Sequence, residues 1–365
     1  MSEFPKFTWL TDANKFDFDP DQLSQTDDMS QTDKDILDDI KRSLVTTGDF
    51  PFAVENQEFN FMRSHEQSIW TKYLIYRYKF KMYPIKKIVS DFPVYLLIEP
   101  TSVCNLRCTV CFQVDKSFTK KQFMGFMNID LFKRLIDEAV TGGTQAVTLA
   151  SRGEPTLHPE LEEMLTYASG KFFDLKLNTN ATKLSDSLIR KILSSGVNEL
   201  VFSVDSHDKE IYESIRVGAK FDQVFANIRQ FCDIKREEFP DSVISTRVSG
   251  VKFREDQDPD AFVSFWKEYV DDVGYVTVEN RWDTYNNPVR TDTDHPCEYL
   301  WERMYVWHDG KCNPCDVDYK SVLSVGDAKN SSIREIWHSK RYSDLRDDHL
   351  NKLRTKNVPC DRCGI

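Results

Sequence analysis

The sequence lacks the features of several protein classes. No apolar run approaches the roughly 20 residues that a membrane-spanning helix needs, so we expect no membrane partner. The N-terminus, Met-Ser-Glu-Phe-Pro-Lys, lacks the apolar core of a signal peptide, which predicts a cytoplasmic protein. The chain also lacks a net positive charge. Its net charge is −11, whereas a general nucleic-acid binder needs a basic face. Nucleic acid is therefore not an expected partner.

The chain also has no internal repeat and no low-complexity linker. Its 365 residues suit one large domain with appendages, and the hydrophobic share of 40% is compatible with a substantial core. Nine cysteines in a cytoplasmic chain are more typical of metal ligands or catalytic groups than of disulfides. Eight of them form two groups. Only Cys232 stands alone, in a helical pattern, where we expect a small core residue.

From residue 94 the sequence alternates between strand and helix patterns. The predicted strands are Val94–Ile98, Ala146–Ala150, Phe173–Leu177, Glu199–Val204, Val243–Val248 and Gly274–Val278. The predicted helices between them are Ile129–Ala139, Leu161–Ala168, Leu184–Leu193, Phe221–Ile234 and Ala261–Val270. Such alternation predicts an α/β fold with a parallel sheet and right-handed crossovers. Six strands are too few for a closed eight-stranded barrel, so we predict an open, partial (β/α)6 TIM barrel over residues 94–290.

The segment before the barrel, residues 1–93, is predicted to be a partly helical N-terminal extension. Asp33–Leu44 can form an amphipathic helix within an acidic, polar stretch. Trp70–Lys87 interleaves aromatic residues at helical spacing with lysine and arginine. One interpretation is a surface for an anionic substrate or partner. We favour the other, a helix packed on the barrel with its lysines in water.

Three cysteines follow the first predicted strand. Cys104, Cys108 and Cys111 lie within eight residues, on a loop at the carboxyl end of the strand. In a β/α barrel that edge of the sheet is where chemistry is done. Three thiolates can hold three irons of a 4Fe–4S cluster, and the fourth iron then offers an open position for a substrate or cosubstrate. A structural zinc site would need a fourth cysteine or histidine at short spacing, and this loop offers none.

The spacing Cys-x3-Cys-x2-Cys resembles that of the radical S-adenosylmethionine (SAM) superfamily. The resemblance implies that Cys104, Cys108 and Cys111 bind a 4Fe–4S cluster whose open iron holds SAM through its amino and carboxylate groups. Ser151-Arg-Gly-Glu-Pro155 resembles the Gly-Gly-Glu-Pro motif of the family, with Arg152 in place of the first glycine. In the family the motif meets the SAM amino group, and a carboxylate facing an ammonium in a sheltered site is a strong contact.

Polar residues at the ends of successive strands extend the resemblance. The residues expected to bind SAM are Phe112, Gly153, Glu154, Asn178, Asn180, Ser203, Asp205 and Arg216. Arg216 resembles a family arginine that meets the SAM carboxylate. The residue before the third cysteine is often aromatic in the family, but here it is Val110, and Phe112 follows the cysteine instead. How the adenine is held is therefore open.

The region 291–365 carries the second group of cysteines. It resembles the SPASM/twitch extension of radical SAM enzymes, which binds auxiliary Fe–S clusters. The resemblance implies one auxiliary 4Fe–4S cluster, held by Cys297, Cys315, Cys360 and Cys363. The chain ends at Ile365 without the further cysteines of a second cluster. The rival interpretation is a zinc ribbon, which four cysteines could build.

Cys312 is passed over by this pattern. It is either a small buried filler or a donor of a hydrogen atom to a substrate radical, which would make the enzyme an epimerase. Without such a donor, the radical must lose an electron instead, and the enzyme is a dehydrogenase. Arg247, Arg281, Trp282 and Tyr285, on late strand ends, are candidate substrate contacts, although an ordinary loop role fits them equally well.

The resemblance as a whole implies a radical SAM oxidoreductase. SAM would be cleaved reductively to a 5′-deoxyadenosyl radical that abstracts hydrogen from substrate, with an electron donor such as flavodoxin or ferredoxin. We expect a polar small-molecule substrate, with sugars and aminocyclitols as candidates. Residues 1–93 show no clear strand triplet followed by helices, the pattern of a leader-binding domain, so a peptide (RiPP) maturase is the alternative. The alternative of another class is a non-catalytic zinc-binding interaction protein.

Overall fold

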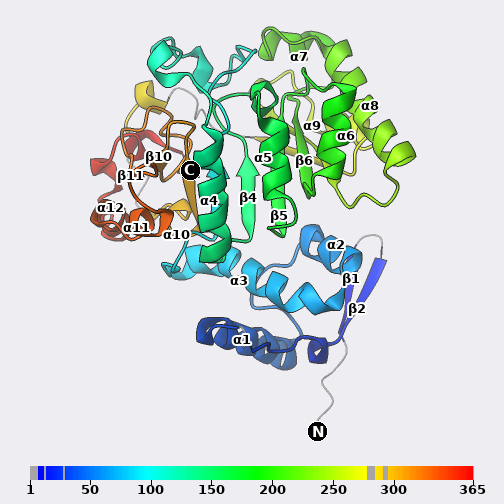
Figure 1. The fold of residues 1–365 in the computed structure, drawn as a ribbon, viewed down its shortest axis with the longest axis vertical. Coiled ribbons are helices and arrows are strands. Elements are labelled where there is room, and N and C mark those ends of the chain that lie inside the picture. Colours follow the sequence, from blue (N-terminus) through cyan, green and yellow to red (C-terminus); the bar gives the residue numbers. More distant parts are fainter. Residues whose placement is uncertain (1–6, 12–13, 28, 278–283, 291–294, 365) are drawn as a thin grey trace. The chain divides into compact units, whose positions relative to one another are not determined.

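The computed structural model describes residues 7–11, 14–27, 29–277, 284–290 and 295–364 (Figure 1). The chain divides into two compact units, with the boundary between Ser90 and Asp91. The first unit contains the antiparallel strands β1 (Phe7–Thr11) and β2 (Asn14–Phe18), followed by the helices α1 (Gln31–Thr47), α2 (Asn56–Ser64) and α3 (Trp70–Lys86).

Helix α1 confirms the predicted amphipathic helix and extends it at both ends. Ser30 caps its first turn by accepting a hydrogen bond from the backbone N–H of Asp33, and Gly48 ends it in the left-handed conformation. Helix α3 confirms the predicted aromatic and basic helix. The expectation that its lysines lie in water is wrong for two of them, because Lys79 pairs with Asp33 at 2.5 Å and Lys81 with Glu58 at 3.0 Å.

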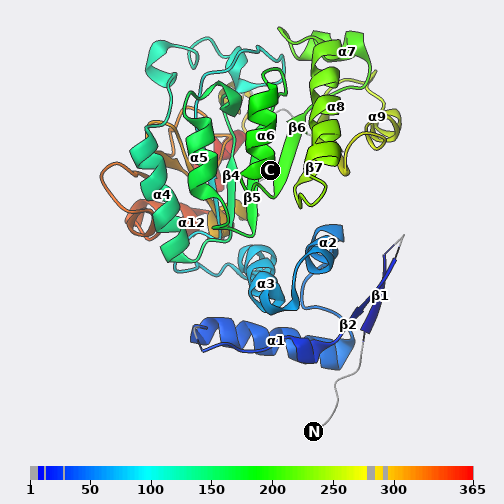
Figure 2. The same ribbon diagram turned by 45° about the vertical axis from the view of Figure 1, so that its right-hand side comes forward.

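The second unit is built on the predicted parallel sheet. Its strands are β3 (Tyr95–Ile98), β4 (Ala146–Leu149), β5 (Asp174–Thr179), β6 (Glu199–Ser203), β7 (Ser245–Lys252) and β8 (Asp272–Thr277), paired in parallel in that order. The helices that follow them are α4 (Ile129–Gly142), α5 (Leu161–Ala168), α6 (Asp186–Ser194), α8 (Phe221–Glu238) and α9 (Pro259–Trp266). Figures 1 and 2 show α4, α5, α6 and α8 side by side over one face of the sheet.

One helix of this unit, α7 (Lys209–Ile215), is absent from the prediction. Within the described residues of the predicted barrel, the other differences in strands and α-helices are at element ends. Strand β7 runs four residues beyond its predicted end at Val248.

The sheet also continues beyond the predicted barrel. Strand β9 (Arg303–Val306) pairs in parallel with β3, and β10 (Lys311–Asn313) and β11 (Gly326–Asp327) add to it in antiparallel fashion. The short helices α10 (Tyr299–Glu302), α11 (Ile333–Trp337) and α12 (Lys340–Leu350) complete the region. Strands β9, β10 and β11 therefore share one nine-stranded sheet with the barrel, and the division at residue 290 stays a prediction.

Alternation along the strands separates the core from the site. In β5, Leu175, Leu177 and Thr179 are buried, and the residues between them are half-buried. Burying a leucine side chain contributes about 1.5–3 kcal/mol, so the leucines fix which way β5 faces. Asn178 consequently lies on the opposite face from Leu177. No helix in the described part of the chain combines the length and apolarity needed to cross a membrane.

Candidate functional site

A cavity of about 360 Å³ lies at the carboxyl ends of the parallel strands. Every residue that the sequence analysis assigned to the first cluster or to SAM lines this cavity. These residues are Cys104, Cys108, Cys111, Phe112, Gly153, Glu154, Asn178, Asn180, Ser203, Asp205 and Arg216. They come from five different loops or strand ends, so the tertiary fold brings together groups spread over more than a hundred residues of sequence.

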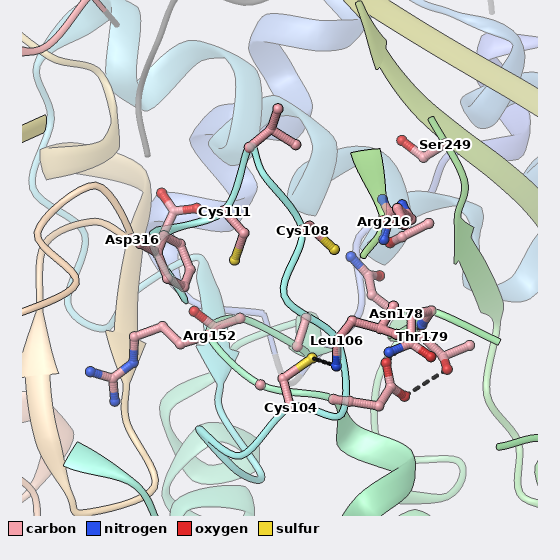
Figure 3. Close-up of a pocket in the computed structure, with 18 of the residues that line it drawn as sticks. Cys104, Leu106, Cys108, Cys111, Arg152, Asn178, Thr179, Arg216, Ser249 and Asp316 are labelled. Atoms are coloured by element: carbon pink, nitrogen blue, oxygen red, sulfur yellow. Dashed lines mark hydrogen bonds between the residues drawn. The ribbon is translucent and has the colours of Figure 1, made fainter. Parts of the chain in front are cut away.

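The three cysteines face a common space (Figure 3). All three are free thiols. The backbone N–H of Leu106 donates to the Sγ of Cys104 at 3.4 Å, and that of Gln113 donates to the Sγ of Cys111 at 3.5 Å. Burial raises the pKa of Cys104 to about 11 and that of Cys111 to about 12. Iron ligation would lower these pKa values, because a coordinating thiol is deprotonated. Three thiols that face one space are a donor set that fits an iron–sulfur cluster.

The cysteine loop is held from two sides by the backbone. The N–H groups of Arg107 and Thr109 each donate at 2.9 Å to the segment after α7, at Val217 and Ile215. On the other side, Gly153 lies so close that a Cβ there would be 2.2 Å from the carbonyl oxygen of Thr101. Only glycine permits this approach, which gives the glycine at position 153 a physical cause.

Glu154 is an acceptor for the loop after β5. Its Oε1 accepts from the hydroxyls of Thr156 at 2.6 Å and Thr179 at 2.7 Å, and its Oε2 accepts from the backbone N–H of Asn180 at 2.7 Å. The side chain is buried, and burial raises its pKa despite these bonds. Oε2 carries a single donor and keeps a site for another. Besides its predicted contact with SAM, Glu154 therefore organises this loop.

Asn180 connects the same loop to the cysteines. Its Nδ2 donates to the Oδ1 of Asn105 at 3.0 Å, and its Oδ1 accepts from the hydroxyl of Thr182 at 2.6 Å. Asn105 in turn donates to Thr182 at 2.8 Å. The polar side-chain atoms of Asn180 thus form hydrogen bonds within the protein. Through Asn105, which directly follows Cys104, Asn180 also positions Cys104.

Other polar groups are left for a ligand. The Oδ1 of Asn178 and the Oγ of Ser151 are buried in the cavity wall without a partner among the described residues. A buried unpaired acceptor costs about 1–3 kcal/mol, which a bound hydroxyl or amino group would recover. Arg216 pairs with Asp205 through Nε at 2.8 Å. Burial lowers the pKa of Arg216, but Asp205, Cys108 and Tyr212 together raise it above its ordinary value. Figure 3 shows Arg216 beside Asn178 and Cys108, at the cavity.

The side chain of Arg152 makes contacts that the glycine of the family motif could not make. Its guanidinium pairs with Glu99 at 2.6 Å and donates through Nη1 to the carbonyl oxygen of Tyr319 at 2.9 Å. It also lies over the ring of Trp307, 4.2 Å from the ring centre. His308 donates through its backbone N–H to Glu99 at 3.2 Å. Figure 3 shows the guanidinium turned away from the three sulfurs. The substitution in the motif therefore connects the barrel to the region of β9–β10.

That region also reaches the cavity. Asp316 and Val317, directly after Cys315, line the cavity wall. Figure 3 shows Asp316 and Arg216 on opposite sides of the three cysteines. The ring of Phe112 stacks on that of Tyr319, with the ring centres 5.2 Å apart. A predicted ligand of the second group is thus one residue away from the cavity wall.

The thiols of the second cysteine group affect one another's pKa values. Burial raises the pKa of Cys315 well above its ordinary value, and the nearby thiols of Cys360 and Cys363 raise it further. Cys297 acts in the same way on Cys360. Each of the four predicted ligands, Cys297, Cys315, Cys360 and Cys363, thus interacts electrostatically with at least one of the others. The charges that act on Cys312 are instead those of carboxylates, Asp327 first among them.

Cys312 lies inside the hydrophobic core. It is fully buried on β10, its thiol faces the carbonyl oxygen of Gly310 at 3.7 Å, and it is not among the residues that line the cavity.

The structure places none of the four predicted substrate contacts at the cavity among the residues that it describes. Arg247 lies near the start of β7, where it pairs with Glu199 and Asp272 at the amino ends of the neighbouring strands. The prediction for Arg247 is wrong because β7 runs to Lys252, so its carboxyl end is elsewhere. Tyr285 is half-buried, donates a hydrogen bond to Asp318 and does not line the cavity. Arg281 and Trp282 lie outside the described residues.

The sequence analysis also missed some residues of the cavity. They are Thr179, Ser249, Val251, Phe253 and Asp316. Three of them, Ser249, Val251 and Phe253, lie on or directly after the part of β7 beyond its predicted end at Val248.

Comparison with known proteins gives two matches to family models. The model of the radical SAM superfamily matches residues 98–265, and that of an iron–sulfur cluster-binding domain, SPASM, matches residues 297–364. A cofactor-modifying protein of tungsten-containing aldehyde ferredoxin oxidoreductase from Pyrococcus furiosus is 34% identical over 112 residues, 30% of each chain. Mycofactocin maturase MftC of Mycolicibacterium smegmatis is 25% identical over 172 residues, 46% of this chain and 42% of that protein. The matches thus span less than half of these relatives.

Solved structures show the same fold. BtrN in complex with AdoMet and 2-DOIA is 18% identical with a TM-score of 0.52, covering 76% of this chain and 95% of that chain. Streptococcus suis SuiB bound to S-adenosylmethionine is 15% identical with a TM-score of 0.57, covering 98% of this chain and 92% of that chain.

Proposed function

We propose that this chain, which belongs to the radical SAM superfamily and carries a SPASM iron–sulfur domain, oxidises a polar small molecule. Reductive cleavage of SAM would initiate the reaction. When bound, the first cluster and SAM supply a 5′-deoxyadenosyl radical that takes a hydrogen atom from the substrate. The protein binds and orients both molecules and excludes water. The observation that carries the proposal is that the three cysteines, Arg216 and the unpaired Asn178 share one cavity.

Each part of SAM has a matching group in the cavity. Arg216 keeps N–H groups beyond the one bonded to Asp205, and a guanidinium is suited to a carboxylate. The free site on the Oε2 of Glu154 is suited to an amino group. The unpaired Oδ1 of Asn178 can accept from a ribose hydroxyl. Phe112 offers an aromatic face at the cavity wall for the adenine.

Oxidation is preferred to epimerisation because of Cys312. An epimerase must return a hydrogen atom to the substrate radical, and a thiol donor must reach the cavity to do so. Cys312 is fully buried in the hydrophobic core and does not line the cavity. We therefore assign it the filler role.

Oxidation requires that the substrate radical lose one electron and release one proton. Cys315 is a proposed ligand of the single auxiliary cluster and adjoins Asp316, which lines the cavity. This arrangement supports the auxiliary cluster as the nearest electron acceptor.

The test is an anaerobic assay with reconstituted protein, SAM and dithionite. Sugars, aminocyclitols, nucleotide-sugars and peptides are screened for stimulation of 5′-deoxyadenosine formation. A stimulating sugar or aminocyclitol whose product is lighter by two hydrogens supports the proposal. A product of unchanged mass that has gained solvent deuterium indicates epimerisation and contradicts it. Colourless protein with stoichiometric zinc contradicts the whole class.

A second candidate, a peptide maturase, is favoured by the first unit. The sequence of residues 1–93 shows no clear strand triplet followed by helices, but in the structure a pair of strands, β1 and β2, precedes α1, α2 and α3. A maturase relative and a structure titled as SuiB bound to its precursor peptide SuiA point the same way. Only two strands are present among the described residues of this unit. If a peptide alone stimulates SAM cleavage and protects β1–β2 from hydrogen exchange, this candidate replaces the first.

A further inference from the structure

The segment after the third cysteine forms a compact loop with a fixed inner face. Residues 112–124 contain two single-turn 3-10 helices, Phe112–Val114 and Lys121–Phe123. Phe118 is fully buried beneath them. Its ring packs against those of Phe112, Phe123 and Tyr319, with centre-to-centre distances of 5.9, 5.8 and 5.5 Å. Because the aromatic side chains are anchored inside, the polar side chains of the loop have a defined outward direction.

Three lysines form the outer face of this loop. Lys116, Lys120 and Lys121 are all exposed, and among the described residues none of them forms an ion pair. The single carboxylate of the loop, Asp115, pairs with Lys320 at 2.5 Å and accepts from the Tyr319 hydroxyl at 2.8 Å. Its charge is therefore compensated by another residue, and the three lysines keep theirs. We call Lys116, Lys120 and Lys121 the lysine face.

The lysine face stands out in an acidic protein. The chain as a whole carries a net charge of −11, and most lysines described in the second unit pair with carboxylates, as Lys176 does with Glu199. The loop starts at the residue after Cys111, a predicted ligand of the first cluster. Figure 1 shows this loop, in teal, at the edge of the sheet toward which the β4 arrow points.

The geometry separates this face from the substrate site. None of the three lysines is among the residues that line the cavity, whereas Val110, Cys111 and Phe112 are. A small anion bound in the cavity would therefore contact Arg216 and not the lysine face. A positive surface outside the cavity, next to the cluster, suits a partner that is itself acidic and approaches from solution.

We propose that the lysine face is the docking surface for a small acidic electron-transfer protein that reduces the first cluster. This inference rests on the proposed function, which requires one electron for each SAM cleaved. In the case of flavodoxin, the anionic flavin hydroquinone gives up one electron and becomes the neutral semiquinone. The cluster held by Cys104, Cys108 and Cys111 accepts that electron and becomes one-electron reduced, and no proton crosses the interface.

The first test measures binding of flavodoxin to the anaerobically reconstituted full chain at low salt. The variant is Lys116→Glu/Lys120→Glu/Lys121→Glu. The matched control, Lys191→Glu/Lys267→Glu/Lys340→Glu, changes the net charge equally on α6, after α9 and on α12. We expect the first variant to bind about tenfold or more weakly than wild type and the control to bind almost normally. Equal weakening by both variants would show a bulk charge effect and overturn the proposal.

A chemical readout locates the contact directly. Zero-length carbodiimide cross-linking joins lysines to carboxylates that touch them, and mass spectrometry then identifies the lysines joined to flavodoxin. Cross-links at Lys116, Lys120 or Lys121 support the proposal. Cross-links confined to other lysines contradict it.

The last test separates this proposal from the proposed function. With dithionite as reductant, the lysine-face variant should form 5′-deoxyadenosine at the wild-type rate, which also shows that it is folded. With reduced flavodoxin, its rate at limiting flavodoxin should fall about tenfold and approach wild type as flavodoxin is increased. If the variant also loses 5′-deoxyadenosine formation with dithionite, the lysines take part in the chemistry of the cavity. That result would overturn the docking proposal. If wild type forms no 5′-deoxyadenosine with dithionite, the proposed function fails, while the binding and cross-linking results still decide the docking.

Discussion

Arg152 and Glu99 form a bidentate ion pair inside the protein. The Nε and Nη2 of Arg152 each lie 2.6 Å from one carboxylate oxygen of Glu99. The two side chains are only 3% and 0% exposed. Arg152 occupies a position where the related motif has glycine, and its partners Trp307 and Tyr319 come from the region of the second cysteine group. The pair therefore fixes the first cysteine loop relative to the second group.

Removal of one partner should be costly. Arg152→Met leaves the Glu99 carboxylate buried without its cation, so we expect a loss of about 3–5 kcal/mol in the free energy of unfolding. Glu99→Gln/Arg152→Met should lose much less, because no charge is left unpaired. Thermal unfolding of the reconstituted protein measures both. Arg77→Met breaks a similar buried pair with Glu58 in the first unit and is the control that should leave SAM affinity unchanged.

The same pair predicts how stability depends on pH. Burial alone would raise the pKa of Glu99, but the charge and hydrogen bonds of Arg152, with a bond from His308, lower it from 4.5 to about 2. A depressed carboxyl pKa gives stability that is complete above the unfolded value of 4.5 and is lost as the pH falls toward 2. The stability difference between wild type and Glu99→Gln/Arg152→Met should be constant from neutral pH to about pH 5 and then shrink. A difference that grows on acidification would contradict this assignment.

The first cysteine group should be separable from the second. Replacement of Cys104, Cys108 and Cys111 by alanine should abolish formation of 5′-deoxyadenosine and lower the iron content by one cluster. The auxiliary cluster should remain visible by absorption and by paramagnetic resonance, because its proposed ligands belong to another group. Cys232→Ala is the matched control and should keep both clusters. SAM cleavage that persists in the triple variant would disprove the assignment.

Glu154→Gln should weaken SAM binding and stability together. The amide cannot accept all the hydrogen bonds that Thr156, Thr179 and Asn180 now donate to the carboxylate. One unsatisfied buried donor costs about 1–3 kcal/mol. Calorimetric SAM titration and thermal unfolding of the same preparation measure the two effects. Unchanged unfolding with weakened SAM binding would show that the loop contacts matter less than the contact with SAM.

Cys312→Ala should leave the chemistry intact. The thiol is buried in the core, so its loss creates a small cavity worth about 1 kcal/mol. Iron content should stay at two clusters, and product formation with any identified substrate should continue. Loss of one cluster would make Cys312 a ligand in place of Cys315, and accumulation of a substrate radical would make it the hydrogen donor.

The sequence by itself determined the barrel and the membership of its site. Apolar runs of period two alternating with helical patterns specify a parallel sheet, and the polar residues directly after such runs must meet at one edge. For this reason Cys104, Glu154 and Asn178 could be grouped from their positions after predicted strands. Arg216, which follows α7, was assigned by the family resemblance, and all four line one cavity.

Only the tertiary structure decided how the second cysteine region joins this site. The addition of β9 beside β3 depends on pairing between strands some 200 residues apart, which no local pattern records. The role of Arg152 likewise depends on partners at Glu99, Trp307 and Tyr319 that are distant in sequence. Arg247 was misplaced because one strand end was predicted four residues too early, and the end of a strand is set by its neighbours in the sheet. Local patterns fix which face of an element is apolar, whereas burial of a charge or a strand edge is fixed by what the rest of the chain packs against it.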